Sequence, residues 1–268
     1  MIDLSQYQGI AQFGRAYRIM LGNDAHAPGS VDRVLVERMV RLCRDTAAHL
    51  YEQFTPAEAR YQAGSRPKLE DHLKHAGADR GGEEQKIEGI CRFCASVAAR
   101  GTDDLDKIRF GGTEEELISR GTDFCNELAR VACAMCQVGG LPARMVMLAD
   151  MERAYCGHVI VEVYRSGVWG AADPTTDVIY RHADARPATT WELMNRPDLV
   201  QRHWRDDSTP YTTPGTFRAA AISKYSLCDR GSYDYAISPI NDYYRSILEM
   251  AGRGWPGGLR WLHGEDAA

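Results

Sequence analysis

The sequence predicts an α+β fold in which a helix packs on an antiparallel sheet. Apolar side chains recur at helical spacing over residues 124–138, which favours an amphipathic helix. Residues 158–164 alternate and are rich in β-branched side chains, and residues 168–173 follow after a short turn, so the two segments are typical of paired strands. We therefore expect a helix that begins at Cys125 to cover this hairpin, with extra helices on the N-terminal side.

Cys125 is expected in the first turn of that helix. Thr122 and Asp123, just before it, are residue types that cap helix N-termini, and a Gly-Gly-Leu-Pro run ends the helix. The backbone N–H groups and the positive end of the helix dipole favour a thiolate at this position, which would make the sulfur nucleophilic near neutral pH. The competing interpretation is a buried core cysteine, because unpaired cysteines are among the most buried residues.

A histidine and an aspartate on the predicted hairpin have spacings that bring them together. If Ser166 and Gly167 form a two-residue loop, Asp173 and Thr175 share a face with His158, and Asp173 lies one diagonal away. A loop centred one residue earlier places His158 directly opposite Asp173. Either register puts the carboxylate within reach of the imidazole, where it can select the tautomer and stabilise the charged ring.

Four short motifs follow one another in a fixed order between residues 120 and 180. They are Cys125 at a helix start, Gly140-Leu141-Pro142-Ala143-Arg144, His158 with Glu162-Val163 on a strand, and Trp169 through Asp173-Pro174-Thr175. This ordered combination resembles the transglutaminase-like superfamily of cysteine enzymes. The resemblance implies a papain/transglutaminase-like core, with the cysteine at a helix N-terminus and the histidine and aspartate on the sheet.

The resemblance also implies a catalytic triad. Cys125 would be the nucleophile, His158 the general base and acid, and Asp173 the carboxylate that orients the histidine. The expected reaction is acyl transfer from an amide through a cysteine thioester, of the protease or peptidase, deamidase or transglutaminase type. The expected substrate is a peptide, a protein or a small amide. Trp169 is a candidate substrate-binding residue, although a large aromatic on a strand is also typical of the core.

Two other functions fit parts of this pattern. An arylamine N-acetyltransferase-like enzyme uses cysteine, histidine and aspartate in the same order, and Arg120-Gly121 before the cysteine resembles that family too. The Pro-Ala-Arg and Asp-Pro-Thr segments argue against it. A non-catalytic binding module on the same fold is the second alternative, and occupation of all three triad positions favours an enzyme instead.

A third alternative is a zinc-stabilised scaffold, because the chain contains two C-x-x-C pairs. Four thiolates can close a tetrahedral zinc site, but both pairs lie in segments with helical periodicity, whereas zinc ribbons present their ligands from turns. We therefore expect reduced cysteines packed in the core, and neither metal nor cofactor. The pairs are Cys91 with Cys94 and Cys133 with Cys136.

Composition limits the partners and the compartment. The 268 residues are 44% hydrophobic, which is enough to bury a full core. A net charge of -5 argues against binding of nucleic acid. There is no apolar stretch of membrane-spanning length and no basic, apolar leader at the start, so we expect no membrane contact and a cytoplasmic location. The sequence leaves the oligomeric state open.

The chain divides into three expected regions. They are an N-terminal helical region packed on the core (1–82), the catalytic core (83–182) and a C-terminal extension (183–268). Within these regions we predict helices over 31–52, 83–100 and 241–250, and a strand over 144–149.

Overall fold

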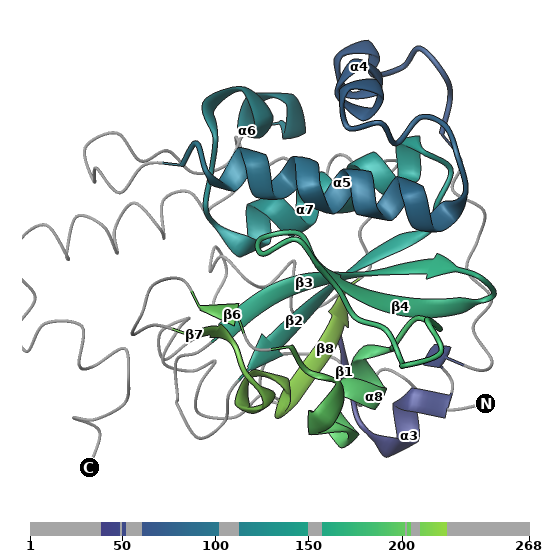
Figure 1. Cartoon of the computed structure of the whole chain (residues 1–268), viewed down its shortest axis with the longest axis vertical. Coiled ribbons are helices and arrows are strands. Elements are labelled where there is room, and N and C mark those ends of the chain that lie inside the picture. The colour runs from purple at the N-terminus through teal and green to yellow at the C-terminus, as the bar shows by residue number, and fades with distance from the viewer. Residues whose placement is uncertain are drawn as a thin grey trace, which may run out of the picture.

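A computed structural model of the chain contains helices on both sides of one antiparallel sheet (Figure 1). It describes residues 39–48, 50–51, 61–101, 113–149, 157–201, 203–204 and 210–223. The strands are β1 (Met39–Leu42), β2 (Ala143–Ala149), β3 (Gly157–Arg165), β4 (Val168–Asp173), β5 (Val178–Ile179), β6 (His203–Trp204), β7 (Pro210–Thr212) and β8 (Ala219–Ser223). The helices are α3 (Arg44–Ala48), α4 (Pro67–His75), α5 (Glu83–Ala98), α6 (Glu114–Arg120), α7 (Cys125–Val138) and α8 (Thr190–Asn195), with 3-10 turns η4 (Pro197–Leu199) and η5 (Pro214–Phe217).

The main sheet has the strand order β1-β8-β2-β3-β4-β5, with antiparallel neighbours throughout, and β6 pairs separately with β7. In Figure 1 the helices α4 to α7 lie on one side of the sheet, and α3 and α8 lie on the other. The predicted α+β class with an antiparallel sheet is therefore confirmed. Among the described helices, none combines the length and the apolar character needed to cross a bilayer.

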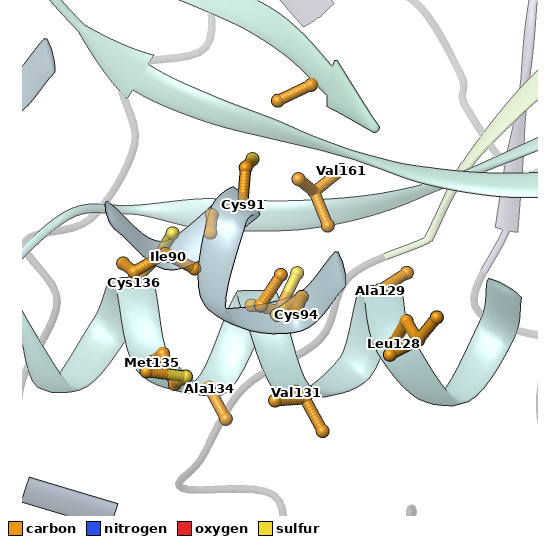
Figure 2. Packing of buried hydrophobic residues seen from close by; sticks show 14 of the residues in the cluster. Ile90, Cys91, Cys94, Leu128, Ala129, Val131, Ala134, Met135, Cys136 and Val161 are labelled. Carbon is orange, nitrogen blue, oxygen red and sulfur yellow. The ribbon is translucent and has the colours of Figure 1, made fainter. Parts of the chain in front are cut away.

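Strand β3 separates two hydrophobic cores, because its side chains alternate between the faces of the sheet. Val159, Val161 and Val163 belong to the core on the side of α5 and α7, whose packing Figure 2 shows. Ile160 belongs to the core on the other side, together with Leu148 of β2. A strand that is buried on both faces reads as a continuous apolar run, which is why residues 159–163 contain only one polar residue.

The helix predicted over residues 124–138 is α7, and it ends as predicted at the glycine pair. Gly140 has a positive φ of 82°, and the Leu141 N–H donates to the Cys136 carbonyl at 2.8 Å, which closes a Schellman motif. Small side chains on α7 allow α5 to pack closely against it, and α7 in turn packs on β2 and β3. The second predicted helix, over 83–100, is confirmed as α5.

The hairpin of β3 and β4 has the first of the two predicted registers. Arg165 pairs with Val168, so Ser166 and Gly167 form the two-residue loop. Both loop residues have positive φ, 52° and 79°, which is the conformation that matches the right-handed twist of the flanking strands. The predicted strand over 144–149 is confirmed as β2, which pairs with the other edge of β3.

The prediction of one helix over residues 31–52 is wrong. Residues 39–42 of that range form β1, and α3 covers only Arg44–Ala48. Four residues of the pattern Met-Val-Arg-Leu are too short to distinguish a helix from a strand, and here β8, about 180 residues later, supplies the pairing partner. The predicted helix over 241–250 lies outside the described residues. The domain boundaries stay predictions, but β8 shows that the C-terminal region supplies a strand to the central sheet.

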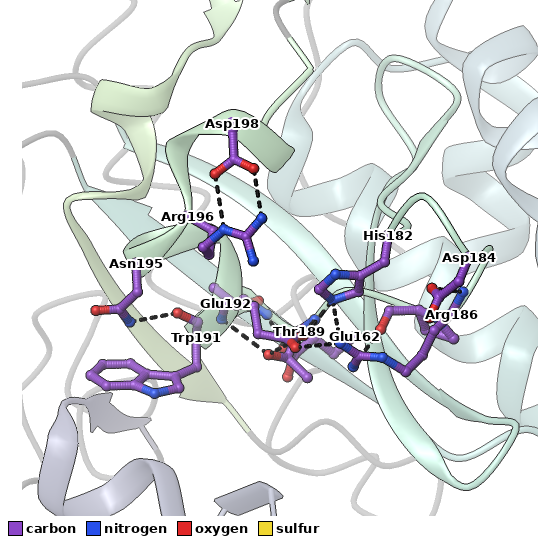
Figure 3. Close-up of polar contacts among 12 residues, drawn as sticks. Glu162, His182, Asp184, Arg186, Thr189, Trp191, Glu192, Asn195, Arg196 and Asp198 are labelled. Atoms are coloured by element: carbon purple, nitrogen blue, oxygen red, sulfur yellow. Dashed lines mark hydrogen bonds and ion pairs between the residues drawn. The ribbon is translucent and has the colours of Figure 1, made fainter.

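Helix α8 is attached to β3 by a buried carboxylate, and Figure 3 shows this contact region. Thr189 and Glu192 form a capping box at the helix start. The next N–H, of Thr190, donates to Oε1 of the buried Glu162 at 2.7 Å. The same carboxylate accepts from the Tyr51 hydroxyl at 2.8 Å and pairs with Arg144. A buried charge is stable only when it is paired and hydrogen-bonded, so this cluster fixes four segments of the chain relative to one another.

Gly121 lies in the turn that leads into α7, and Gly140, which follows the end of α7, provides a comparison for it. Gly121 has a φ of 78°, and a Cβ built there would lie 2.5 Å from the Arg100 carbonyl oxygen. Gly140 has a φ of 82° with open space around it. We expect Gly140→Ala to lower the free energy of unfolding by about 1–2 kcal/mol, the cost of the left-handed conformation alone. Gly121→Ala should lower it by about 2–5 kcal/mol, because the backbone must also move.

Urea denaturation of both variants measures this difference. Equal losses of stability would show that Arg100 does not confine the chain at Gly121.

Candidate active site

Cys125 is the first residue of α7 and is partly exposed, with one side against the core. The N-cap is Phe124, with an extended backbone and no side-chain cap, so the predicted capping roles of Thr122 and Asp123 are wrong. The first N–H groups of a helix have no partner within the helix and point along its axis. The Cys125 sulfur is therefore next to the donor end of α7.

Thr122 connects the preceding loop to the first turn of α7 instead of capping it. Its hydroxyl accepts from the Phe124 N–H at 3.2 Å and donates to the Glu127 carboxylate. Arg120 donates to both oxygens of that carboxylate at 3.0 Å. Glu127 is only 3% exposed, so these contacts replace the water that would surround its side chain at the surface. Together they hold the loop that presents Cys125.

His158 and Asp173 form the buried pair that the hairpin register predicts. Nε2 of His158 lies 2.7 Å from Oδ2 of Asp173, and the two residues are 3% and 0% exposed. Because Glu162 pairs with Ala171, His158 and Asp173 project from the same face of the hairpin. The pairing of β3 with β4 ends at Val161 and Ala172, so Asp173 lies one residue and His158 three residues past it.

Asp173 has further donors on each of its oxygens. The Thr175 N–H donates to Oδ1 at 2.9 Å, and the Thr212 hydroxyl donates to Oδ2 at 3.3 Å. Burial acts to raise the pKa of this carboxyl, but the charge and hydrogen bond of His158 and the Thr175 N–H outweigh it, so the pKa is lower than its ordinary value. Asp173 is therefore held as a carboxylate.

His158 is in hydrogen-bond contact with Cys125 as well as with Asp173. Burial acts to lower the pKa of His158, but the Asp173 carboxylate, its hydrogen bond and the contact with Cys125 raise it to about 10. Since Nε2 is occupied by Asp173, Nδ1 is the nitrogen that remains for the sulfur. The geometry thus brings the three predicted residues into one line of sulfur, imidazole and carboxylate.

Trp169 lies away from this line, four residues before Asp173 on β4. It is 3% exposed, with the Arg144 guanidinium 4.0 Å from its ring centre and the Tyr164 ring edge-on at 5.5 Å. These contacts make it part of the wall of the fold. A substrate-binding role for Trp169 stays a prediction.

The two C-x-x-C pairs lie in the core between α5 and α7. All four thiols are 0% exposed, and burial raises the pKa of each one. Figure 2 shows three of them, Cys91, Cys94 and Cys136, among the apolar side chains of this core. The described part of the chain contains no group of three or more histidine, cysteine or acidic side chains arranged to hold a metal ion.

Thr212 is the site residue that sequence reasoning missed. It follows Asp173 by 39 residues and belongs to a segment without a clear periodic pattern. No local signal links a lone threonine to a carboxylate at such a separation. The Arg120, Thr122 and Glu127 contacts were also missed, although all three residues lie beside Cys125, because a Thr before a helix is expected to cap it.

A comparison with protein families finds one match. Residues 76–174 match the model of the transglutaminase-like superfamily, which confirms the resemblance over a segment that includes Cys125, His158 and Asp173. Searches of curated proteins and of solved structures find no match to the chain.

The buried pair predicts a specific pH dependence. Protonated His158 stabilises the folded state because its pKa is raised there, so this contribution is full below about pH 6.5 and is lost as the pH rises through about 10. The lowered pKa of Asp173 has the opposite sign, and its contribution is lost as the pH falls below the ordinary carboxyl range. We expect nitrogen NMR to show a protonated His158 ring at pH 8.

Asp173→Asn is the control for this measurement. Without the carboxylate, the His158 ring should be neutral at pH 8. A neutral ring at pH 7 in the unmodified protein would contradict the assigned pair.

Proposed function

From the transglutaminase-like match over residues 76–174, we propose that this protein is a thiol acyl-transfer enzyme that acts on amides through a Cys125 thioester. The observation that supports it most is the contact of His158 with both Cys125 and Asp173 in a buried line. Three residues from two separate parts of the chain meet there in the order that nucleophilic catalysis requires. No second function has an observation of equal weight.

In the first step, the Cys125 sulfur attacks the carbonyl carbon of the amide. The protonated His158 ring favours the thiolate beside it, and Asp173 keeps that ring oriented and charged. The tetrahedral intermediate places a negative charge on the carbonyl oxygen. The Cys125 N–H at the start of α7 is a donor for this oxygen, and one such donor is typically worth about 3 kcal/mol.

In the second step, the intermediate collapses and the carbon–nitrogen bond breaks. His158 transfers its proton to the departing amine, and the acyl group stays on the sulfur as a thioester. His158, now neutral, then takes a proton from an incoming nucleophile, which attacks the thioester and releases Cys125. Water as the nucleophile makes the enzyme a peptidase or deamidase, and an amine makes it a transglutaminase.

The proposed substrate is a peptide, a protein or a small amide, and the proposed location is a reducing compartment such as the cytoplasm. Thiolate chemistry needs a reduced sulfur, and the six described cysteines are all unpaired.

The reaction is tested by incubating the protein with peptide amides and glutamine-containing peptides, with and without an added primary amine. Ammonia release without amine supports hydrolysis, and amine incorporation supports transfer. An absence of both would count against the proposal.

Cys125 should be the most reactive thiol among the described cysteines. It is partly exposed and in contact with a protonated imidazole, whereas the four core thiols are fully buried with raised pKa values. Limiting iodoacetamide followed by mass-spectrometric mapping measures this order. Cys43 is the matched comparison, since it is also partly exposed but has no histidine contact among the described residues. Faster labelling of Cys43 would refute the assignment.

Replacement of Cys125 by alanine should abolish turnover without unfolding the protein. Loss of the nucleophile of a triad lowers kcat on the order of 10,000-fold or more, because no other group can form the covalent intermediate. A partly exposed side chain at a helix start contributes little to packing, so the melting temperature should be nearly unchanged. The control is Cys43→Ser, which should keep full activity. Retained turnover in Cys125→Ala would exclude the thioester route.

A further inference from the structure

Thr212 makes a contact with the triad from outside the segment that matches the family. Its side chain is completely buried, and its hydroxyl donates to Oδ2 of Asp173 at 3.3 Å. This is the same oxygen that receives Nε2–H of His158 at 2.7 Å. Thr212 belongs to β7, 38 residues after the matched segment ends.

We propose that Thr212 is a positioning residue for the triad, acting through Asp173 to keep His158 aligned with Cys125. The inference rests on the proposed function. It adds a residue of the C-terminal region to the machinery, so the triad depends on a segment that has no part in the family match.

The hydrogen-bond donors on the two oxygens of Asp173 together fix the orientation of its carboxylate plane. The Thr175 N–H donates to Oδ1 from the same strand–turn segment, and His158 donates to Oδ2, so a second donor on Oδ2 is needed if the carboxylate is to keep its orientation without relying on His158. The Thr212 hydroxyl supplies that second donor and has no charge of its own, so it adds no competing ion to the pair. A carboxylate held at both oxygens presents Oδ2 to His158 in one orientation only.

The segment around Thr212 is itself held firmly. Thr212 pairs with His203 of β6, and η5 follows directly with Phe217 buried against Tyr180, ring centres 5.6 Å apart. Burial, and then the nearby Asp173 carboxylate, raise the pKa of the Tyr180 hydroxyl, so Tyr180 stays neutral. Thr212 is therefore fixed from two sides before it reaches Asp173, as a positioning group must be.

Thr190 offers a matched control for the substitution that tests this role. It is also a completely buried threonine, and its hydroxyl has no hydrogen-bond partner in the described part of the protein. Thr190→Val therefore removes a buried hydroxyl of the same kind without removing a bond to the triad. Thr212→Ser keeps the hydroxyl and is the rescue variant.

The experiment measures the rate of Cys125 alkylation by iodoacetamide between pH 4 and pH 10 in the full chain, with the melting temperature of each variant. We expect Thr212→Val to slow alkylation by about 3- to 10-fold near pH 6, the range of one hydrogen bond. The pH of half-maximal rate should rise, because a loosely oriented imidazolium stabilises the thiolate less well. Thr212→Ser and Thr190→Val should keep the rate and the pH profile of the unmodified protein.

Two outcomes overturn the inference while leaving the proposed function intact. The first is an unchanged alkylation profile in Thr212→Val, and the second is an equal change in Thr190→Val. If Thr212→Val fails to fold, Thr212→Ala compared with Thr212→Ser makes the same test, and equal rates in that pair overturn the inference. A Cys125 that is no more reactive than Cys43 in the unmodified protein would instead defeat the proposed function itself.

Discussion

The hydrogen bond between His158 and Asp173 is the contact on which the site depends. Both side chains are almost fully buried, where an unpaired carboxylate or imidazolium would be strongly unfavourable. The pair is therefore stable only if each charge has the other and enough donors to replace water. Asp173 receives these from Thr175 and Thr212, and His158 has Cys125 on its far side. Any movement of β4 relative to β3 would separate His158 from Asp173 and leave each buried charge without its partner.

The Cys125 sulfur and the His158 imidazole are positioned by different parts of the fold. The sulfur is set by α7, which packs in the core with α5, and by the loop that Arg120, Thr122 and Glu127 hold against the first turn. The imidazole is set by the hairpin register of β3 and β4, which the turn at residues 166–167 defines. The two meet where α7 and β3 begin, since Cys125 is the first residue of α7 and His158 is the second residue of β3. The position of α7 on the sheet therefore controls the distance between the Cys125 sulfur and the His158 ring.

The parts of the site that the sequence predicted are the parts determined by local chain chemistry. A two-residue turn defines a register, and helical periodicity with a Gly-Gly stop defines α7, so His158, Asp173 and Cys125 were all identified from short windows. The capping residue of α7 was predicted wrongly, because the N-cap is Phe124, and the Thr122 hydroxyl accepts from the Phe124 N–H while it donates to Glu127. Strand β1 pairs with β8, and Thr212 binds Asp173, and in both cases the two partners are far apart along the chain. A short stretch of sequence therefore never contains both partners. Tertiary pairing decided these cases against local preference.

The region that positions the candidate site is larger than the segment that matches the family. Residues 76–174 contain Cys125, His158 and Asp173, but the sheet that carries the last two continues through β8 and β1, which lie after and before that segment. Strand β2 pairs with β8 along one edge and with β3 along the other, so β8 supports the strand that borders β3 on that side. On the face of β3 that also carries His158, Glu162 joins β3 to Tyr51 and to the start of α8, both outside the match. Since His158 lies four residues from Glu162 on β3, segments before and after the matched one help to determine where the imidazole lies.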